Sequence, residues 1–354
     1  MEDLTSLLPA SCPVPQPERE RIVLGHGAGG KLTAALFEEL FLPAFRNPAL
    51  EQRGDQAVVR APGGGRLALS TDSFVVTPIF FPGGDIGSLA VHGTVNDLAM
   101  GGARPLWLTA AFILEEGLEQ AELRRVVASM AAAARAAGVE IVTGDTKVVN
   151  RGKGDRVFIT TAGVGWVPDG VELGPERARP GDQILLSGTV GDHGLAILSQ
   201  REGLGFEEAI VSDSAALPPL VEAMLAAGGG GVRCLRDPTR GGLATALCEL
   251  AQRAGLGMRV EQEQIPVREA VASACELLGI DPLYAANEGK LVALVAVEAA
   301  ERVLQAMRGH RLGGEARRIG EVVAGRAGLV TLATGLGGTR VLDTPWHEPL
   351  PRIC

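Results

Sequence analysis

Lysine, aromatic side chains and paired cysteines are all scarce in this chain of 354 residues. The net charge of -9 disfavours nucleic-acid binding, because affinity for a phosphate backbone depends on Lys and Arg. No apolar run reaches the roughly 18–20 residues that span a bilayer. The first 21 residues contain acidic residues and no long apolar stretch, which is atypical of a signal peptide. We therefore predict a cytoplasmic protein that binds neither nucleic acid nor membrane.

The five cysteines show no CxxC or similar spacing, which disfavours a zinc site. Cys248 and Cys275 fall in helical patterns and are expected to be small core side chains. Cys354 needs a different explanation, because it is the last residue of "EPLPRIC" and a chain end rarely contributes to a core. It is not a prenylation signal, which requires Cys fourth from the end. A redox group, a metal ligand and a substrate carrier remain open.

Only four of the 33 basic residues are lysines, so their positions are informative. Lys31 in "HGAGGK", Lys147 in "TGDTK" and Lys290 in "NEGK" lie in Gly-rich or acid-flanked turns, as does Lys153 in "NRGKGD". Arg cannot replace Lys where a compact point charge is needed. We expect functional roles for Lys31 and Lys147, and a solvent-exposed loop position for Lys153.

Hydrophobic periodicity predicts alternating strands and helices, which indicates two layered α/β domains. The segment 167–182 is rich in Pro, Gly and charge and is the best domain boundary. We predict a disordered extension (1–20), an N-terminal domain (21–170), a C-terminal α/β domain (180–334) and a mobile tail (335–354). The expected strands are 66–76, 105–114, 139–146, 157–166, 183–188 and 291–297, and the expected helices are 85–103, 118–138, 193–201, 217–227, 241–254 and 299–308.

Five aspartates stand at predicted strand ends or turns, each in a stretch that also contains Gly, Ser, Thr or Asn: Asp55, Asp72, Asp97, Asp145 and Asp237. A single Asp in a turn usually caps it. Together, such carboxylates are suited to Mg²⁺, which takes oxygen ligands and bridges to phosphates. A metal–phosphate site and a set of turn caps both remain open, as they do for Asn96 beside Asp97.

The Gly-rich stretch "GHGAGGK" precedes a predicted helix, and its backbone N–H groups around Gly29, Gly30 and Lys31 are suited to holding phosphate. It is not a Walker A motif, because the spacing differs and Leu32 follows the lysine. By itself the pattern is a weak signal.

Taken together, the motifs resemble the HypE family of hydrogenase maturation factors over about residues 20–354. The motifs are "STDSFVVTPIFFPGGDIG", "VNDLAMGGARP", "IVTGDTKVV", "GDHGLAI", "RDPTRGGLA", "NEGK" and the terminal "PRIC". The wider superfamily is similar to aminoimidazole ribonucleotide synthetase, thiamine-monophosphate kinase and selenophosphate synthetase. The resemblance implies an N-terminal domain that dimerises through its strands into a β-barrel-like core. It also implies ATP between the two domains, with Mg²⁺ held by scattered aspartates.

In this family the terminal cysteine receives a carbamoyl group from a HypF-type carbamoyltransferase. The resemblance therefore implies an ATP-dependent carbamoyl dehydratase that converts S-carbamoyl-cysteine to a thiocyanate. The cyanide then goes to iron on a HypC–HypD complex, for a NiFe-hydrogenase. A proline-stiffened tail that swings between partners and active site fits this role.

Matching the family motifs assigns roles by position. Catalytic residues would be Cys354, Lys147 and Glu288. A lysine can stabilise charge on the oxygen and a glutamate can take protons, but the individual roles of Lys147 and Glu288 remain open at this stage. The implied magnesium ligands are Asp72, Asp97, Asp145 and Asp237. The implied ATP-binding residues are Gly29, Gly30, Lys31, Asp55, Asn96, Asp145 and Thr146.

Two alternatives remain at this stage. Another phosphoryl-transfer enzyme of the superfamily, resembling a kinase or selenophosphate synthetase, would leave the terminal thiol unexplained. The synthetase also normally has Cys or selenocysteine in its N-terminal glycine loop, which "GHGAGGK" lacks. A non-catalytic carrier that presents Cys354 would not need these five aspartates and a phosphate-binding loop. His193 in "GDHG" is either a turn cap near the nucleotide or an ordinary core residue.

Overall fold

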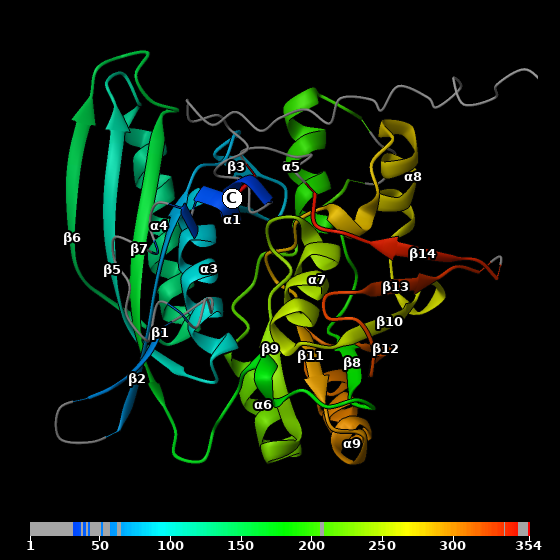
Figure 1. The fold of residues 1–354 in the computed structure, drawn as a ribbon. Helices are drawn as coiled ribbons and strands as arrows, with labels where there is room; N and C mark the ends of the chain where they lie inside the picture. The colour runs from blue at the N-terminus through cyan, green and yellow to red at the C-terminus, as the bar shows by residue number, and fades with distance from the viewer. Residues whose placement is uncertain are drawn as a thin grey trace, which may run out of the picture.

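The computed structural model consists of two α/β halves that lie side by side (Figure 1). It describes residues 31–36, 38, 39, 42, 51, 57–61, 65–205, 209–335, 337–345, 353 and 354. The predicted site residues Gly29, Gly30 and Asp55 and the predicted extension 1–20 lie outside these residues. Among the helices described, none is long and apolar enough to cross a membrane.

The N-terminal half contains a five-stranded sheet that is covered on one face by two helices. Only β5 and β6 pair in parallel, with α4 as their crossover, and the other neighbours are antiparallel. Helix α3 lies between this sheet and the C-terminal half (Figure 1). In sheet order the strands are β1 (Ala57–Arg60), β2 (Arg66–Phe74), β7 (Val157–Val167), β5 (Arg104–Glu115) and β6 (Glu140–Val149), and the helices are α3 (Ile86–Met100) and α4 (Gln120–Ala137).

Local sequence explains where these two helices begin and end. Asp85 caps α3 by accepting the N–H groups of Gly87 and Ser88, and the Ser88 side chain bonds back to Asp85 in a capping box. Helix α4 ends at Gly138, which adopts the left-handed conformation that glycine tolerates. Both helices lie within the predicted ranges 85–103 and 118–138, so those predictions are confirmed.

The C-terminal half is built on a seven-stranded sheet. In sheet order its strands are β14 (Thr339–Leu342), β13 (Val330–Ala333), β10 (Gly257–Glu261), β12 (Arg317–Val323), β8 (Gln183–Leu186), β11 (Val292–Val295) and β9 (Val232–Arg236). Its helices are α5 (Asp192–Glu202), α6 (Pro218–Gly228), α7 (Gly242–Ala254), α8 (Glu269–Leu278) and α9 (Val297–Arg308). The predicted helices near 193–201, 217–227, 241–254 and 299–308 are confirmed as α5, α6, α7 and α9.

One expectation about the chain end is wrong. The sequence loses periodicity after Gly335, yet Thr339–Leu342 form β14 and pair antiparallel with β13. Only Leu342 of this strand is buried, so four residues among glycines and prolines carry almost no pattern. The start of the predicted tail is therefore part of the C-terminal sheet.

A shared hydrophobic core joins the two halves and includes the penultimate residue of the chain. It contains Phe74 and Ile86 from the N-terminal half and Leu195 and Val271 from the C-terminal half. Ile353 is 1% exposed within it, and Cys354 packs against it. The chain end thus lies between the halves, where Figure 1 marks it.

Candidate functional site

Four of the predicted acidic residues, which we call the acidic cluster, lie at the junction between the two halves. Asp72 is on β2, Asp97 is near the end of α3, Asp237 follows β9, and Glu288 precedes β11. Ser70, two residues before Asp72, donates a 2.6 Å hydrogen bond to Asp97. Along β2, Ala68, Ser70 and Phe74 are buried against the helices, and the alternation places Asp72 on this same face.

Glu288 is a buried carboxyl surrounded by other acids. It is 3% exposed, and Asp237 is 5% exposed. Burial raises the pKa of Glu288 well above its ordinary value, and the negative charges of Asp237, Asp72 and Asp213 raise it further. A group in such surroundings exchanges protons more readily near neutral pH than an exposed carboxylate does.

Arg240 partly compensates this negative charge. Its guanidinium lies 3.2 Å from Asp72, and both side chains are only partly exposed. Burial raises the pKa of Asp72, while the Arg240 charge opposes that rise. Arg240 was not singled out from the sequence, although it belongs to the motif "RDPTRGG" that also contains Asp237.

Asn96 joins the two halves through its side-chain amide. Its Nδ2 donates to the backbone carbonyls of Ala215 and Glu288 at 3.0 and 3.2 Å, and its Oδ1 accepts the N–H of Leu217 at 2.7 Å. The residue is buried, so these bonds satisfy the amide inside the protein. Asn96 therefore fixes the backbone of Glu288, a role that neither sequence alternative for Asn96 described.

A buried ion pair lies directly beside Glu288. Lys290 Nζ is 3.0 Å from Asp213 Oδ2, and Asp213 also accepts the backbone N–H groups of Glu288 and Gly289. Burial opposes ionisation of Asp213, but the Lys290 charge and the Glu288 N–H outweigh it and lower the pKa of this carboxyl. Asp213 was not predicted, and the scarcity of lysine was the one signal that pointed to Lys290.

The last two residues of the chain contact the same junction. The carbonyl of Ile353 accepts a 2.6 Å hydrogen bond from His193 Nε2, and the main-chain oxygen of Cys354 accepts one of 3.2 Å from the N–H of Val75. Val75 is three residues beyond Asp72, which is about 10 Å of extended chain. The last residue, whose thiol is partly exposed, is therefore docked at the junction that also contains Asp72.

Asp145, Thr146 and Lys147 lie apart from this cluster. They are exposed on the edge strand β6, where Lys147 Nζ is 2.6 Å from Asp145 Oδ2. The Lys147 hydrogen bond, with the Thr146 N–H, lowers the pKa of Asp145. Asp145 pairs with Ala111 on the neighbouring strand β5. Strand β6 is three strand spacings, about 14 Å, from β2, which carries Asp72.

The pleat also directs the side chains of Asp145 and Lys147 to the other face of the sheet. Ala110 is buried toward the helices, so its neighbour Ala111 and the paired Asp145 point to the opposite face, on which no helix of the described residues lies (the helix-free face). Lys147, two residues on, shares that face. One copy of the chain therefore does not bring Asp145 or Lys147 to Asp72 and Glu288.

Lys31 is bound to the segment that follows β14. It begins α1 (Lys31–Leu36), its Nζ is 2.8 Å from Asp343, and its backbone N–H bonds to Pro345. The predicted phosphate-binding lysine is thus paired with a carboxylate of the C-terminal half.

The acidic cluster has the donor chemistry for magnesium. No group of three or more His, Cys, Asp or Glu side chains among the described residues is arranged to hold a metal ion by itself. Mg²⁺ commonly takes one or two carboxylates and completes its shell with water and phosphate oxygens. Burial raises the pKa values of Asp72 and Glu288, so a cation would favour their ionised forms. The residues present fit this ion when phosphate supplies the remaining ligands.

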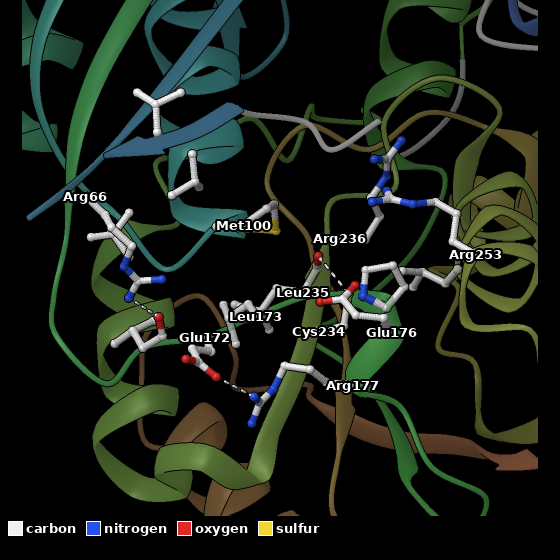
Figure 2. Close-up of a pocket in the computed structure, with 18 of the residues that line it drawn as sticks. Arg66, Met100, Glu172, Leu173, Glu176, Arg177, Cys234, Leu235, Arg236 and Arg253 are labelled. Atoms are coloured by element: carbon white, nitrogen blue, oxygen red, sulfur yellow. Dashed lines mark hydrogen bonds and ion pairs between the residues drawn. The ribbon is translucent and has the colours of Figure 1, made fainter. Parts of the chain in front are cut away.

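A separate cavity of about 610 Å³ lies between the halves (Figure 2). Its lining includes several arginines, but Arg66 donates to the carbonyls of Pro168 and Val171, and Arg177 pairs with Glu172. None of the predicted site residues that the structure describes lines this cavity.

Comparisons with known proteins agree with this two-part architecture. Residues 53–167 match the N-terminal domain of AIR synthase related proteins, and residues 179–332 match the C-terminal domain. The carbamoyl dehydratase HypE of Cupriavidus necator is 60% identical over 334 residues, covering 94% of this chain and 95% of that protein. HypE of Escherichia coli is 50% identical over 337 residues, covering 94% and 99%.

Solved structures give the same result. A crystal structure of a HypE–HypF complex matches with a TM-score of 0.83 and 49% identity, covering 88% of this chain and 100% of the matched chain. A crystal structure of HypE in complex with ATP matches with a TM-score of 0.79 and 52% identity, covering 94% and 100%.

Proposed function

Because the chain belongs to the HypE family of carbamoyl dehydratases, we propose that it dehydrates an S-carbamoyl group carried on its own Cys354. It is an ATP-binding enzyme of hydrogenase maturation, and a HypF-type carbamoyltransferase is its partner. One observation carries the assignment to this thiol: the last residue of the chain is docked between the two halves, where its main-chain oxygen accepts the N–H of Val75, three residues beyond Asp72.

The reaction needs ATP because an amide oxygen is a poor leaving group. The carbamoyl oxygen attacks the γ-phosphorus, the bond from that phosphorus to the bridging oxygen of ADP breaks, and the carbamoyl nitrogen loses a proton to give an O-phosphorylated imidate. The second N–H proton then leaves as the C≡N bond forms and phosphate departs with the former carbamoyl oxygen. The products are Cys354 thiocyanate, ADP, phosphate and one net proton.

Glu288 is our candidate for the base. Its carboxyl is buried, its pKa is raised, and its backbone is held by Asn96 and Asp213. A base whose pKa lies nearer the working pH than that of an ordinary carboxylate is better matched to proton transfer. Arg240, paired with Asp72, adds positive charge on the side where phosphate oxygens would lie.

Magnesium would be held by Asp72, Asp97 and Asp237, with Glu288 close by. When bound, the ion would neutralise charge on the transferring phosphoryl group. The cluster supplies carboxylate oxygens on three separate elements, which suits an ion that bridges them to phosphate. Gly29, Gly30 and Asp55 remain predicted ATP contacts outside the described residues.

A second copy of the chain would complete the site. The helix-free face of the N-terminal sheet exposes large apolar side chains, among them Leu69, Trp107 and Ile113, at 42%, 46% and 42%. Asp145 and Lys147 lie on this same face. We propose a homodimer that buries the face, in which Asp145, Thr146 and Lys147 of one copy serve the acidic cluster of the other. An exposed edge strand at β6 offers a further pairing surface.

The tail would move during the cycle. In the docked position Cys354 is only partly exposed between the two halves, so transfer of a carbamoyl group requires the thiol to come out. The docked position brings the group back to the acidic cluster. Release of the tail would then deliver cyanide, for which a HypC–HypD complex in the cytoplasm is the proposed acceptor.

Intact-mass spectrometry tests the assignment. The chain is incubated with the HypF-type partner and a carbamoyl donor, with and without ATP. We expect an adduct on Cys354 that becomes lighter by one water only when ATP is added. An adduct that never loses water would favour the carrier alternative, and phosphoryl transfer to another acceptor without an adduct would favour a kinase-like enzyme.

A further inference from the structure

The docked chain end is held by a hydrogen bond that fixes the state of a buried histidine. His193 is fully buried near the start of α5, and its Nε2 lies 2.6 Å from the carbonyl of Ile353. Its Nδ1 lies 2.8 Å from Ser212 Oγ, and the Phe81 ring packs against the imidazole at nearly a right angle. A carbonyl only accepts, so Nε2 must carry the proton and Nδ1 must accept from the Ser212 hydroxyl.

Burial keeps this imidazole neutral. It lowers the pKa of His193, while Asp213 and the bond to Ile353 oppose the shift. The neutral ring therefore has one donor and one acceptor, and the docked chain end occupies the donor. Undocking leaves that N–H to find water or another acceptor in a buried place, which has a free-energy cost.

The residues next to Ser212 link this histidine to Glu288. Asp213 accepts the N–H of Glu288 and bonds Lys290, while Ser214 bonds His92 of α3. The N–H of Ala215 donates to the carbonyl of Glu288. One short loop, 212–215, thus contacts both the histidine that holds the tail and the backbone of the predicted base.

We propose that His193 is a positioning residue that recognises the docked chain end through the main-chain carbonyl of Ile353, and that loop 212–215 ties this docking to the placement of Glu288. The recognised ligand is the chain's own C-terminal dipeptide. It must supply a carbonyl for His193 and an apolar side chain for the shared core. The second part of the proposal rests on the proposed function, whereas the first does not.

Alkylation of the terminal thiol by a bulky maleimide tests the first part. Cys234, Cys248 and Cys275 are buried, and mass fragmentation assigns the label to Cys354. In His193→Ala the lost hydrogen bond should shift the tail toward the undocked state and raise the alkylation rate about tenfold. His193→Gln, whose amide can place an N–H at a similar reach, should restore most of the protection. His310→Ala, at a partly exposed turn after α9, is the matched control and should match wild type.

Ile353→Asp is a second variant that should undock the chain end, and it leaves His193 unchanged. It places a charge in the shared core only when the tail docks, so it should expose the thiol as His193→Ala does while the rest of the chain stays folded. If His193→Ala does not fold, Ser212→Ala, which removes the donor to Nδ1, replaces it. Wild-type alkylation rates in a folded histidine or serine variant would overturn the proposal.

Single-turnover kinetics test the link to Glu288. In chains already carbamoylated on Cys354, with saturating ATP, His193→Ala should dehydrate about tenfold more slowly, while transfer of the carbamoyl group to Cys354 is not slowed. Unchanged dehydration with faster alkylation would overturn the coupling but leave tail recognition standing. A wild-type chain that never dehydrates its adduct would refute the proposed function, with the alkylation result unaffected.

Discussion

Asp213 and Lys290 form an ion pair 3.0 Å apart whose side chains are 2% and 11% exposed, directly beside the backbone of Glu288. Such a pair is a costly feature, because two charges lose most of their hydration. Asp213 offsets part of that cost by accepting two backbone N–H groups. The pair thus holds the loop 212–215 against the residues 288–290.

Removing one partner of this pair should destabilise the fold. Lys290→Met leaves the Asp213 charge buried without its cation, and we expect a loss of about 3–5 kcal/mol in the free energy of unfolding. Urea unfolding measures the effect. Lys153→Met, at an exposed lysine, is the control and should change stability little. A similar small change in both variants would show that the buried pair contributes nothing.

Glu288→Gln separates proton transfer from binding. The amide keeps the shape of the side chain but cannot accept a proton, so the variant should bind ATP and accept carbamoyl at Cys354, yet dehydrate about a hundredfold more slowly or worse. Rapid-quench mass spectrometry of the adduct gives the rate. A variant that dehydrates at the wild-type rate would remove Glu288 from the chemistry.

The same substitution should alter how stability depends on pH. The pKa of Glu288 is raised in the folded protein by burial and by neighbouring acids, so between its ordinary value and the raised one the unfolded chain binds fewer protons. The contribution of Glu288 to stability is therefore greatest below about pH 4.5, and it is lost as the pH rises through the pKa of the folded state. Glu288→Gln should remove this decline. Parallel pH profiles for the two proteins would contradict it.

Asp72→Asn should weaken binding of magnesium and ATP. The change removes one negative charge from the acidic cluster while keeping the shape, and it removes the carboxylate that lies 3.2 Å from the Arg240 guanidinium. Calorimetry with and without Mg²⁺ measures the affinity. Asp169→Asn, in the exposed turn after β7, serves as the control. Equal Mg²⁺ dependence in both variants would make Asp72 a structural residue only.

Trp107→Asp should separate the proposed homodimer. Trp107 is 46% exposed on the helix-free face of the sheet, so a charge there would be buried only in the dimer. Leu277→Asp, at a 72% exposed position on α8, is the matched control. Sedimentation should give monomers for the first and the wild-type state for the second. If neither substitution alters the assembly, this face does not form the interface.

The pattern of the sequence predicted the elements that carry their own local signals. Helices α3 and α4 have clear caps or glycine stops, and their ranges were close to the observed ones. Strand β14 was missed because its order depends on pairing with β13 rather than on its own four residues.

The residues of the acidic cluster could be predicted from sequence motifs, but the contacts that hold them in place could not. Asp72, Asp97, Asp237 and Glu288 each stand in a recognisable stretch, whereas the contacts that fix them join distant parts of the chain. Lys290 and Asp213, which are hydrogen-bonded, are 77 residues apart in the sequence, and His193 and Ile353 are 160 residues apart. Periodicity describes neighbours along one element, so it contains no information about such pairs.

The separation of Lys147 from Glu288 within one chain could not be predicted from the sequence either. Both were predicted as catalytic, yet the pleat directs Lys147 to the helix-free face of the sheet, while Glu288 lies on the other side.

Mixing two inactive variants tests whether two copies share a site. Lys147→Ala and Glu288→Gln chains, mixed and allowed to exchange subunits, should recover about a quarter of wild-type activity, since half of the dimers are mixed and each has one intact site. No recovery, despite verified exchange, would contradict a shared site.

The fate of the carbamoyl oxygen tests the central claim most directly. The carbamoyl group on Cys354 is prepared with a heavy oxygen isotope, ATP is added, and the released inorganic phosphate is analysed by mass spectrometry. If the carbamoyl oxygen is phosphorylated before it leaves, the label must appear in phosphate in proportion to the thiocyanate formed at Cys354. Label that appears in water instead, with unlabelled phosphate, would contradict the account.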